Sequence, residues 1–482
     1  MKVLLYNAIF ALALIGTVSP QSIIWNHTYG GDSYDEADAV KQTYDGGFVA
    51  AGYTQSFGLG RFGNAYLIRT DANGDTLWTR MFGSEGMDVF ADMIVTPDSG
   101  CIAVGLTDTP TNFENIYVVK VDKDGNTVFE KNYGGSEKDV ALSIAPSEDG
   151  GYVLTGGTKS VSAGEEDLFL FKIDSNGDSL WFKTYGTAGN DPGYGISPSS
   201  DGGFIVTGLY NWSDAWLLKV NADGDTMWTK TFGGANYEEA NLGISAPDSG
   251  IIFCGSTSSY GSGELDAYLV RTDASGNMLW QKTYGGAGYD EGRKIVSNPN
   301  GGYIILANTD SQINGEFNYF IISVDENGDT LWTKTIGTTG GEDRAYGIQN
   351  ISSNEYIVAG STFDHVNLGE ATLTLIKDDS APSGTIDDNT ISGFKLFDAY
   401  PNPFNPVTTI RYSIGKTGTQ RNITVLKVYD ILGNEIAALV NKYQLPGEYE
   451  VKFDASGLAS GIYLFRLKSG DFFKTGKLML LK

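Results

Sequence analysis

Short runs in which apolar and polar residues alternate fill the chain from residue 23 to residue 379. One unit, between residues 140 and 186, contains four such runs in succession: VALSIAPS, YVLTGGT, DLFLFKID and SLWFKTYG. Turns rich in Gly, Asn and Asp separate the runs, which is typical of antiparallel hairpins. No segment of this region shows sustained helical periodicity. The pattern therefore predicts four antiparallel strands in each unit.

The unit recurs along the chain, and an aromatic residue in its last run marks each copy. Successive anchors are 53, 51, 52, 47, 52 and 52 residues apart. They are Trp25, Trp78, Phe129, Trp181, Trp228, Trp280 and Trp332. A repeat of this length with four antiparallel strands describes the blade of a β-propeller.

Each end of the repeat region lacks what the other end supplies. The run IIWNHTY at residues 23–29 has no partner before it, and the last unit ends at ATLTLIK, residues 371–377, without its own tryptophan-bearing strand. Pairing these two strands closes the ring and removes exposed strand edges. We therefore expect an all-β fold in which a seven-bladed β-propeller spans residues 23–379.

The turn DANGD that precedes Trp78 predicts a tight hairpin loop. Gly74 suits the left-handed position of such a loop, and Asn73 or Asp75 can bond back to the backbone. Trp78 is then expected to pack against the next blade. The same string begins like an EF-hand calcium loop, but Phe82 stands where the bidentate Glu would be needed, so no metal site is predicted.

The turn and its tryptophan resemble the tryptophan-docking repeat of quinoprotein-type propellers, over residues 23–379. The Asp-to-Gly spacing is one residue shorter here, and the adjacent cysteine pair of the dehydrogenases is absent. The resemblance therefore implies the construction of the blades, and no cofactor is predicted. Cys101 and Cys254, the only cysteines, fall in different blades and are expected to be buried and unpaired.

An acidic residue stands ten positions after every anchor. The set is Asp35, Asp88, Asp139, Asp191, Glu238, Asp290 and Glu342. One interpretation is a mouth of carboxylates that binds a cation or a basic ligand. The favoured interpretation is that the acids cap strands, because a binding site seldom needs every blade equally.

Residues that depart from the repeat are better candidates for a ligand site. The fourth unit has a short loop, YNWS, and its Trp212 is the one tryptophan outside a repeated position. Aromatic, acidic and basic residues near the same predicted rim complete the candidate set: Tyr34, Tyr237, Tyr289, Glu36, Glu239, Glu291, Arg293 and Arg344. Such a rim suits a carbohydrate or protein ligand, although a solvated rim with scattered aromatics fits the same residues.

No catalytic residue is predicted. The two histidines are His27 and His365, and no HExxH, GxSxG or metal-ligand motif occurs. A pair of rim carboxylates could hydrolyse a glycoside, so a glycan-acting hydrolase is the alternative to a non-catalytic binding module.

Composition and the N-terminus indicate export. The chain carries a net charge of −26, which argues against nucleic acid as a partner because phosphate binding needs a basic surface. Residues 1–22 combine an early lysine, a short apolar run and small polar residues, which is typical of a secretory signal peptide. That apolar run is too short to span a bilayer, and no transmembrane segment is predicted elsewhere.

The composition changes after residue 379. Residues 380–393 are polar and form a predicted linker. Residues 394–482 have a balance of +5, which leaves −31 for the rest of the chain. Their four alternating runs, TTIRYSI, ITVLKVYDI, GEYEVKFDA and GIYLFRLKSG, predict a small immunoglobulin-like β-sandwich.

Separated motifs in these 89 residues occur in a specific order. They are YPNPF (Tyr400, Pro401, Asn402, Pro403 and Phe404), then GIY with Gly461 and Tyr463, and a basic last run that includes Lys477. In this order they resemble the C-terminal sorting domain of type IX secretion cargo. The resemblance implies passage through the periplasm, recognition by the outer-membrane secretion machinery through residues 394–482, and a secreted or cell-surface location.

Overall fold

The computed structural model describes residues 21–58, 62–109, 112–312, 315–338, 340–364, 369–379, 395–396, 399, 402, 404–414, 422–429, 435–444, 447–469 and 472–481. The predicted signal peptide, apart from Gln21 and Ser22, and the predicted linker lie outside these residues, as do Tyr400, Pro401 and Pro403. No helix in the described part is long and apolar enough to cross a membrane.

Seven sheets form the propeller, each built on four antiparallel strands, which are consecutive in the chain in six of the sheets. Blade one contains β2 (Asp35–Gln42), β3 (Phe48–Thr54), β4 (Asn64–Thr70) and β5 (Thr76–Phe82). Blade two contains β6 (Asp88–Val95), β7 (Cys101–Thr109), β8 (Asn112–Val121) and β9 (Thr127–Tyr133). Blade three contains β10 (Asp139–Pro146), β11 (Tyr152–Thr158), β12 (Glu166–Ile173) and β13 (Ser179–Tyr185), and the short β14 (Asn190–Asp191) joins β12 in parallel.

The remaining blades follow the same order. Blade four contains β15 (Gly193–Pro198), β16 (Phe204–Tyr210), β17 (Asp214–Val220) and β18 (Thr226–Phe232). Blade five contains β19 (Glu238–Ser245), β20 (Ile251–Thr257), β21 (Asp266–Thr272) and β22 (Met278–Tyr284). Blade six contains β23 (Asp290–Ser297), β24 (Tyr303–Thr309), β25 (Asn318–Val324) and β26 (Thr330–Ile336). Blade seven contains β27 (Gly341–Asn350), β28 (Glu355–Asp364), β29 (Glu370–Asp378) and, from the other end of the region, β1 (Gln21–Tyr29).

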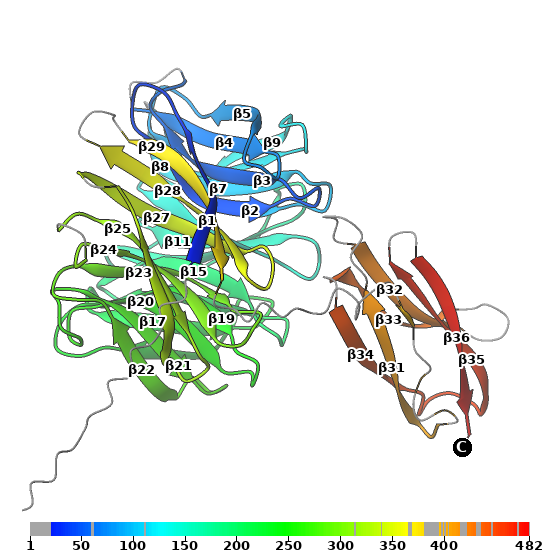
Figure 1. Cartoon of the computed structure of the whole chain (residues 1–482). Coiled ribbons are helices and arrows are strands. Elements are labelled where there is room, and N and C mark those ends of the chain that lie inside the picture. Colours follow the sequence, from blue (N-terminus) through cyan, green and yellow to red (C-terminus); the bar gives the residue numbers. More distant parts are fainter. Residues whose placement is uncertain are drawn as a thin grey trace, which may run out of the picture.

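The first strand of each blade lies on the inside of the ring. These strands contact one another in the order β2, β6, β10, β15, β19, β23 and β27, and β27 contacts β2 again. In Figure 1 the blades follow one another from blue through green to yellow, so that the first and last lie side by side. The predicted ring of seven blades is confirmed.

The closing pair has the predicted partners. Strand β1 is antiparallel to β29, with Gln21 opposite Asp378 and Tyr29 opposite Ala371. The Tyr29 hydroxyl also donates to the Gly74 carbonyl oxygen of blade one at 2.7 Å. The N-terminal strand is therefore bonded to both the last and the first blade.

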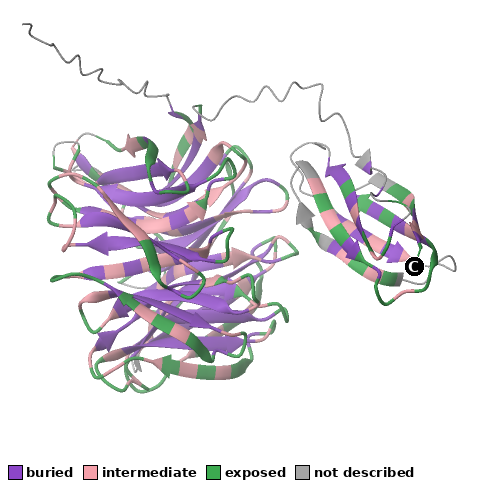
Figure 2. Ribbon diagram, turned by 90° about the horizontal axis from the view of Figure 1, so that it is seen from below, coloured by how far each residue is buried: buried purple, intermediate pink, exposed green. Residues whose placement is uncertain are grey.

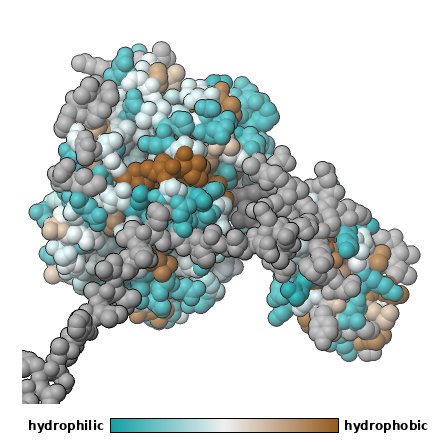
Figure 3. Space-filling model, in the orientation of Figure 1, coloured by the Kyte–Doolittle hydropathy of each residue, from teal (hydrophilic) through white to brown (hydrophobic). Residues whose placement is uncertain are grey.

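Burial follows the position of a strand within its blade. Strands β3 and β4 are buried at every residue, whereas the outer strand β5 alternates between exposed and partly buried residues. Figure 2 shows the same distribution, with buried inner strands and exposed outer edges. In Figure 3 the visible propeller surface is largely hydrophilic, with one compact apolar patch. Cys101 and Cys254 are both buried and free, as predicted.

The repeated turn is held by its first residue. In blade one the Asp71 carboxylate accepts from the backbone N–H groups of Asn73 at 2.8 Å and Asp75 at 3.0 Å. The expectation that Asn73 or Asp75 would bond back to the backbone is therefore wrong. The Asp71 side chain therefore caps two backbone amides of the turn in which Gly74 is left-handed.

The anchor aromatic packs against the turn glycine of the next blade. In blade five Gly276 has φ +77°, and a Cβ placed on it would lie 2.6 Å from Cζ3 of Trp228. The turn glycine is therefore needed both for its backbone conformation and for the room it leaves to the indole ring.

We expect Gly276→Ala to lower the free energy of unfolding by about 1–3 kcal/mol, because it combines left-handed strain with a steric contact. Gly150→Ala is the matched control, since Gly150 has φ +84° but nothing within 4 Å of its Cβ position. Chemical denaturation of both variants measures the difference. Equal losses would show that the tryptophan contact contributes nothing.

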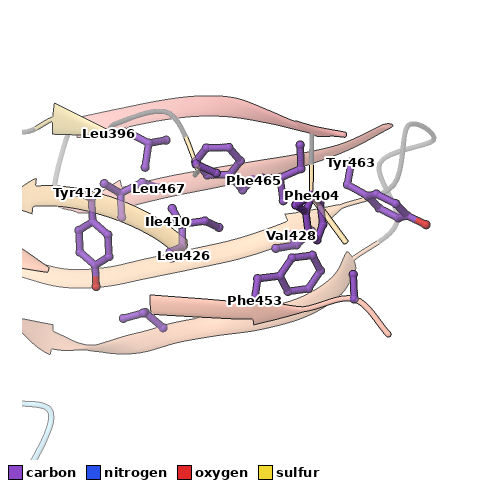
Figure 4. Close-up of a cluster of buried hydrophobic side chains, with 14 of the residues drawn as sticks. Leu396, Phe404, Ile410, Tyr412, Leu426, Val428, Phe453, Tyr463, Phe465 and Leu467 are labelled. Carbon is purple, nitrogen blue, oxygen red and sulfur yellow. The ribbon is translucent and has the colours of Figure 1, made fainter. Parts of the chain in front are cut away.

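The C-terminal residues form two facing antiparallel sheets. One sheet has the order β30 (Lys395–Leu396), β31 (Val407–Ile414) and β34 (Gly447–Asp454). The other has the order β33 (Glu435–Gln444), β32 (Asn422–Tyr429), β35 (Gly461–Ser469) and β36 (Phe472–Leu480). Figure 4 shows Phe404, Ile410, Phe453 and Phe465 among the side chains that pack between them. The predicted β-sandwich is confirmed.

Two residues of the YPNPF motif bind the last strand of this sandwich. The Asn402 side chain donates to the Lys477 carbonyl oxygen and accepts from the Met479 N–H, both at 2.8 Å. Phe404 is buried in the core, and its backbone exchanges hydrogen bonds with Met479 and Leu481. Tyr463 is also buried and donates to the Ala459 carbonyl oxygen, whereas Gly461 and Lys477 are exposed.

Candidate functional site

The repeated acids connect loops of the propeller scaffold by hydrogen bonds. Asp290, for example, accepts from the Gly286 N–H and the Ser311 hydroxyl, each at 2.7 Å. It thereby ties the loop that enters β23 to the loop that follows β24. Equivalent bonds occur in every blade, which supports the capping interpretation over a carboxylate mouth.

In blade seven the acid with this role is Asp343 instead of Glu342. Asp343 accepts from the Thr338 N–H at 2.6 Å, and its own N–H donates to the Phe317 carbonyl oxygen. The assignment of Glu342 to the repeated set is therefore wrong by one residue. The loop before β27 contains one more residue than its counterparts, which a fixed count from the anchor does not reveal.

Each innermost strand has a β-bulge three residues after its capping acid. In β2 the register with β3 shifts between Ala37 and Ala39, so Asp38 lies outside the ladder. All seven strands shift at the same place, and the residues left outside are Asp38, Ala91, Leu142, Tyr194, Asn241, Arg293 and Tyr346. A bulge re-aims the extra side chain and often does so beside a functional site.

The seven bulge residues line one cavity in the centre of the ring. It has a volume of about 440 Å³, and Glu36, Val89, Glu239 and Lys294 complete its wall. A second cavity of about 210 Å³ shares Asp38 and Lys294 with the first and continues along the inner strands towards Lys41 and Ile94. These cavities form the central channel of the propeller.

The wall of the channel is not uniform. Blades two and three contribute Val89, Ala91 and Leu142, which carry no polar side-chain atoms. The other blades contribute charged, amide and phenol groups. The channel therefore has one aliphatic side and one polar side, although the scaffold around it is sevenfold.

Two glutamates of the polar side are each bonded to a tyrosine. The Tyr34 hydroxyl donates to Glu36 at 2.5 Å, and the Tyr237 hydroxyl donates to Glu239 at 2.6 Å. Glu239 also accepts from Asn241 and from the Ser256 hydroxyl. Burial raises the pKa of Glu36, while the Tyr34 bond and the nearby Arg293 act in the opposite direction.

The basic residues pair with a third glutamate. Arg293 lies 2.9 Å and Arg344 lies 3.7 Å from the Glu291 carboxylate. The guanidinium of Arg344 also stacks on Phe317, 3.8 Å from the ring centroid. With Tyr34, which precedes β2 of blade one, and with residues of blades six and seven, Arg344 lines a separate cavity of about 390 Å³.

Two polar atoms of the channel have no hydrogen-bond partner among the residues that the structure describes. They are Oδ2 of Asp38 and Nε of Arg293, and both atoms are buried. Burial, together with the charge of Glu36, raises the pKa of the Asp38 carboxyl, while Lys294 and Arg293 act to lower it. An acceptor and a donor therefore remain free on the polar side of the channel.

The structure brings some of the predicted site residues together and leaves others apart. Glu36, Glu239 and Arg293 line the channel. Tyr34 and Tyr237 do not line it, but they donate hydrogen bonds to Glu36 and Glu239. Trp212 and Tyr289 are not among the residues that line it. Trp212 is 56% exposed in the turn between β16 and β17, where its φ is +65°.

Sequence reasoning missed the bulge residues Asp38, Tyr194, Asn241 and Tyr346 and their neighbour Lys294. A signal was present, because the third position after the acid varies from blade to blade, with only Tyr194 and Tyr346 alike, while the acid itself recurs. No cluster of His, Cys, Asp or Glu within the described ranges is arranged to hold a metal ion.

Comparison with known proteins identifies the C-terminal region. Residues 398–481 match the family model of the secretion system C-terminal sorting domain. This segment is therefore a type IX sorting domain, which directs the chain to the cell surface or the medium. No curated protein matches the sequence.

Solved structures similar to this chain are distant. A protein of unknown function from Dyadobacter fermentans has 12% identity and a TM-score of 0.43, over 74% of this chain and 99% of that one. An apocarotenoid oxygenase from Synechocystis has 10% identity and a TM-score of 0.41, over 70% and 88%. A putative exo-beta-1,3-galactanase from Bifidobacterium bifidum has 11% identity and a TM-score of 0.31, over 54% and 98%. These likenesses carry no argument about function.

Proposed function

Because the chain ends in a domain that directs it to the cell surface or the medium, we propose that its propeller is a non-catalytic binding module for a carbohydrate or protein ligand. The ligand enters the central channel. One observation carries this proposal: each blade places one bulge residue in the channel, and these seven residues are of six different types, whereas the scaffold positions recur. A site that prefers one ligand needs such variation.

The arrangement of the carboxylates favours binding over catalysis. Glu239 accepts three hydrogen bonds from neighbouring side chains, and Glu36 is held by Tyr34. Carboxylates engaged in this way are positioned to orient a ligand more than to exchange protons with it.

A glycan-acting hydrolase is the second candidate. Glu36 and Glu239 face the same channel from different blades, and a buried glutamate with a raised pKa is suited to act as a general acid. An enzyme of this kind would need both carboxylates to lie beside the same glycosidic bond of its substrate.

We expect Ala91→Phe to abolish ligand binding with little change in melting temperature. Ala91 is partly exposed on the aliphatic side of the channel, so a phenyl ring there would occupy the cavity without removing a hydrogen bond. Glycan and peptide arrays measure binding, and Trp212→Ala tests the rim alternative, since truncation of this exposed side chain is expected to change stability little. Unchanged ligand binding by Ala91→Phe, together with loss of ligand binding by Trp212→Ala, would place the site on the rim.

A hydrolysis screen on the glycans that bind separates the two candidate functions. No turnover is expected from the unaltered chain. Turnover that Glu239→Gln abolishes, while binding persists, would replace the binding module with the hydrolase.

A further inference from the structure

The two unpaired polar atoms of the channel indicate which chemical group a ligand would need in order to form hydrogen bonds with them. Asp38 Oδ2 can only accept a hydrogen bond when ionised, and Arg293 Nε can only donate one. Leaving such atoms buried and unbonded disfavours the folded state, so a ligand that bonds both recovers that loss. A hydroxyl group both donates and accepts, and adjacent hydroxyls can serve both atoms.

The charges around these atoms disfavour an ionic ligand. The wall contains Glu36, Asp38 and Glu239 on one hand and Arg293 and Lys294 on the other. Arg293 and Lys294 lie close enough to Asp38 to act on its pKa, so the two signs are interspersed. A cation would be repelled by the basic pair and an anion by the carboxylates, whereas a neutral polar group is repelled by neither.

The aliphatic side of the channel requires an apolar face on the same ligand. Val89, Ala91 and Leu142 offer only C–H groups opposite the polar blades. Tyr194 of blade four borders the aliphatic side and Tyr346 of blade seven belongs to the polar side, and burial raises the pKa of both, so their hydroxyls stay protonated. The cavity of about 440 Å³ lies within the range of about 300–1,000 Å³ that is usual for small-molecule sites.

From these three features we propose that the channel binds an uncharged sugar ring, the end of a neutral carbohydrate chain. Its hydroxyl groups bond Asp38 and Arg293, and its C–H face lies on the aliphatic side formed by blades two and three. This inference rests on the proposed function, because it names the ligand class of the same channel.

The test uses the full chain on an array of neutral, acidic and amino-sugar oligosaccharides, followed by titration calorimetry with the best ligand. Asp38→Asn should weaken binding of a neutral glycan at least tenfold, because the amide offers one acceptor oxygen where the ionised carboxylate offers two. Its melting temperature should stay equal or rise, since Oδ2 of Asp38 has no hydrogen bond to lose. Asp178→Asn removes the same charge from an exposed turn and should bind as the unaltered chain does.

The outcomes separate the inference from the proposed function. Binding of a neutral glycan that both Asp38→Asn and Ala91→Phe weaken supports both. Acidic glycans, amino sugars or peptides that bind in place of neutral glycans, and that Ala91→Phe excludes, overturn the inference and leave the proposed function standing. A neutral glycan that binds Ala91→Phe normally overturns both, and so does a chain that binds no glycan and no peptide.

Discussion

Removal of residues 21–29 should abolish cooperative folding of the propeller. These residues form β1, the outermost strand of blade seven, and their loss would leave β29 as an unpaired edge. It would also remove Tyr29 from the core cluster that contains Leu373 and Leu375. Truncation of one large buried side chain costs about 3–5 kcal/mol, and whole domains are stable by only about 5–15 kcal/mol. Calorimetry should therefore show no cooperative transition for the propeller.

A relocated strand is the control for this deletion. Gln21 lies opposite Asp378, so the same nine residues can follow Asp378 through a two-residue Asn-Gly turn and still pair with β29. This rearranged chain should recover the transition, because the ring is closed again. Ile24→Ser, at an exposed position of β1, should change little. A deletion variant that melts within a few degrees of the full chain would show that ring closure is unimportant.

Removal of residues 394–482 should stop delivery to the cell surface in a host that has type IX machinery. The sorting domain matches residues 398–481, so the truncated chain would keep its propeller but lose its export signal. We expect it to accumulate in the periplasm, which cell fractionation with an antibody against the propeller measures. Surface delivery of the truncated chain at the normal level would contradict the assignment.

Single substitutions in the sandwich test whether export needs the folded sorting domain or only its amino-acid sequence. Phe404 is 2% exposed, so Phe404→Ala should destabilise the sandwich by about 3–5 kcal/mol and reduce export. Leu481→Ser changes an exposed apolar residue whose backbone is bonded to that of Phe404, and this variant should be exported normally. Normal export of Phe404→Ala with an unfolded sandwich would show that the machinery reads a linear motif.

The sequence alone was sufficient to predict the propeller, its closure and the C-terminal domain. Strand alternation, Asn-Gly turns and anchors such as Trp78 and Trp228 report on local geometry, because a side chain's position on a pleated strand follows from its place in the chain. The closure of β1 on β29 could also be inferred, since each end lacked one strand. The YPNPF motif identified the sorting domain because its residues and their order are distinctive.

The candidate site depended on the tertiary structure. Asp38 and Arg293 face the channel because each lies in a bulge, and a bulge is a property of how two strands pair, which residue alternation does not reveal. The one-residue difference between Glu342 and Asp343 also needed the structure, because hydrogen bonds to the neighbouring loops show which of the two acids caps β27. Asn402 likewise bonds the Lys477 carbonyl 75 residues away. The sequence by itself determined the blades, their number and the destination of the chain, whereas the contents of the channel were decided by contacts between residues that the sequence keeps far apart.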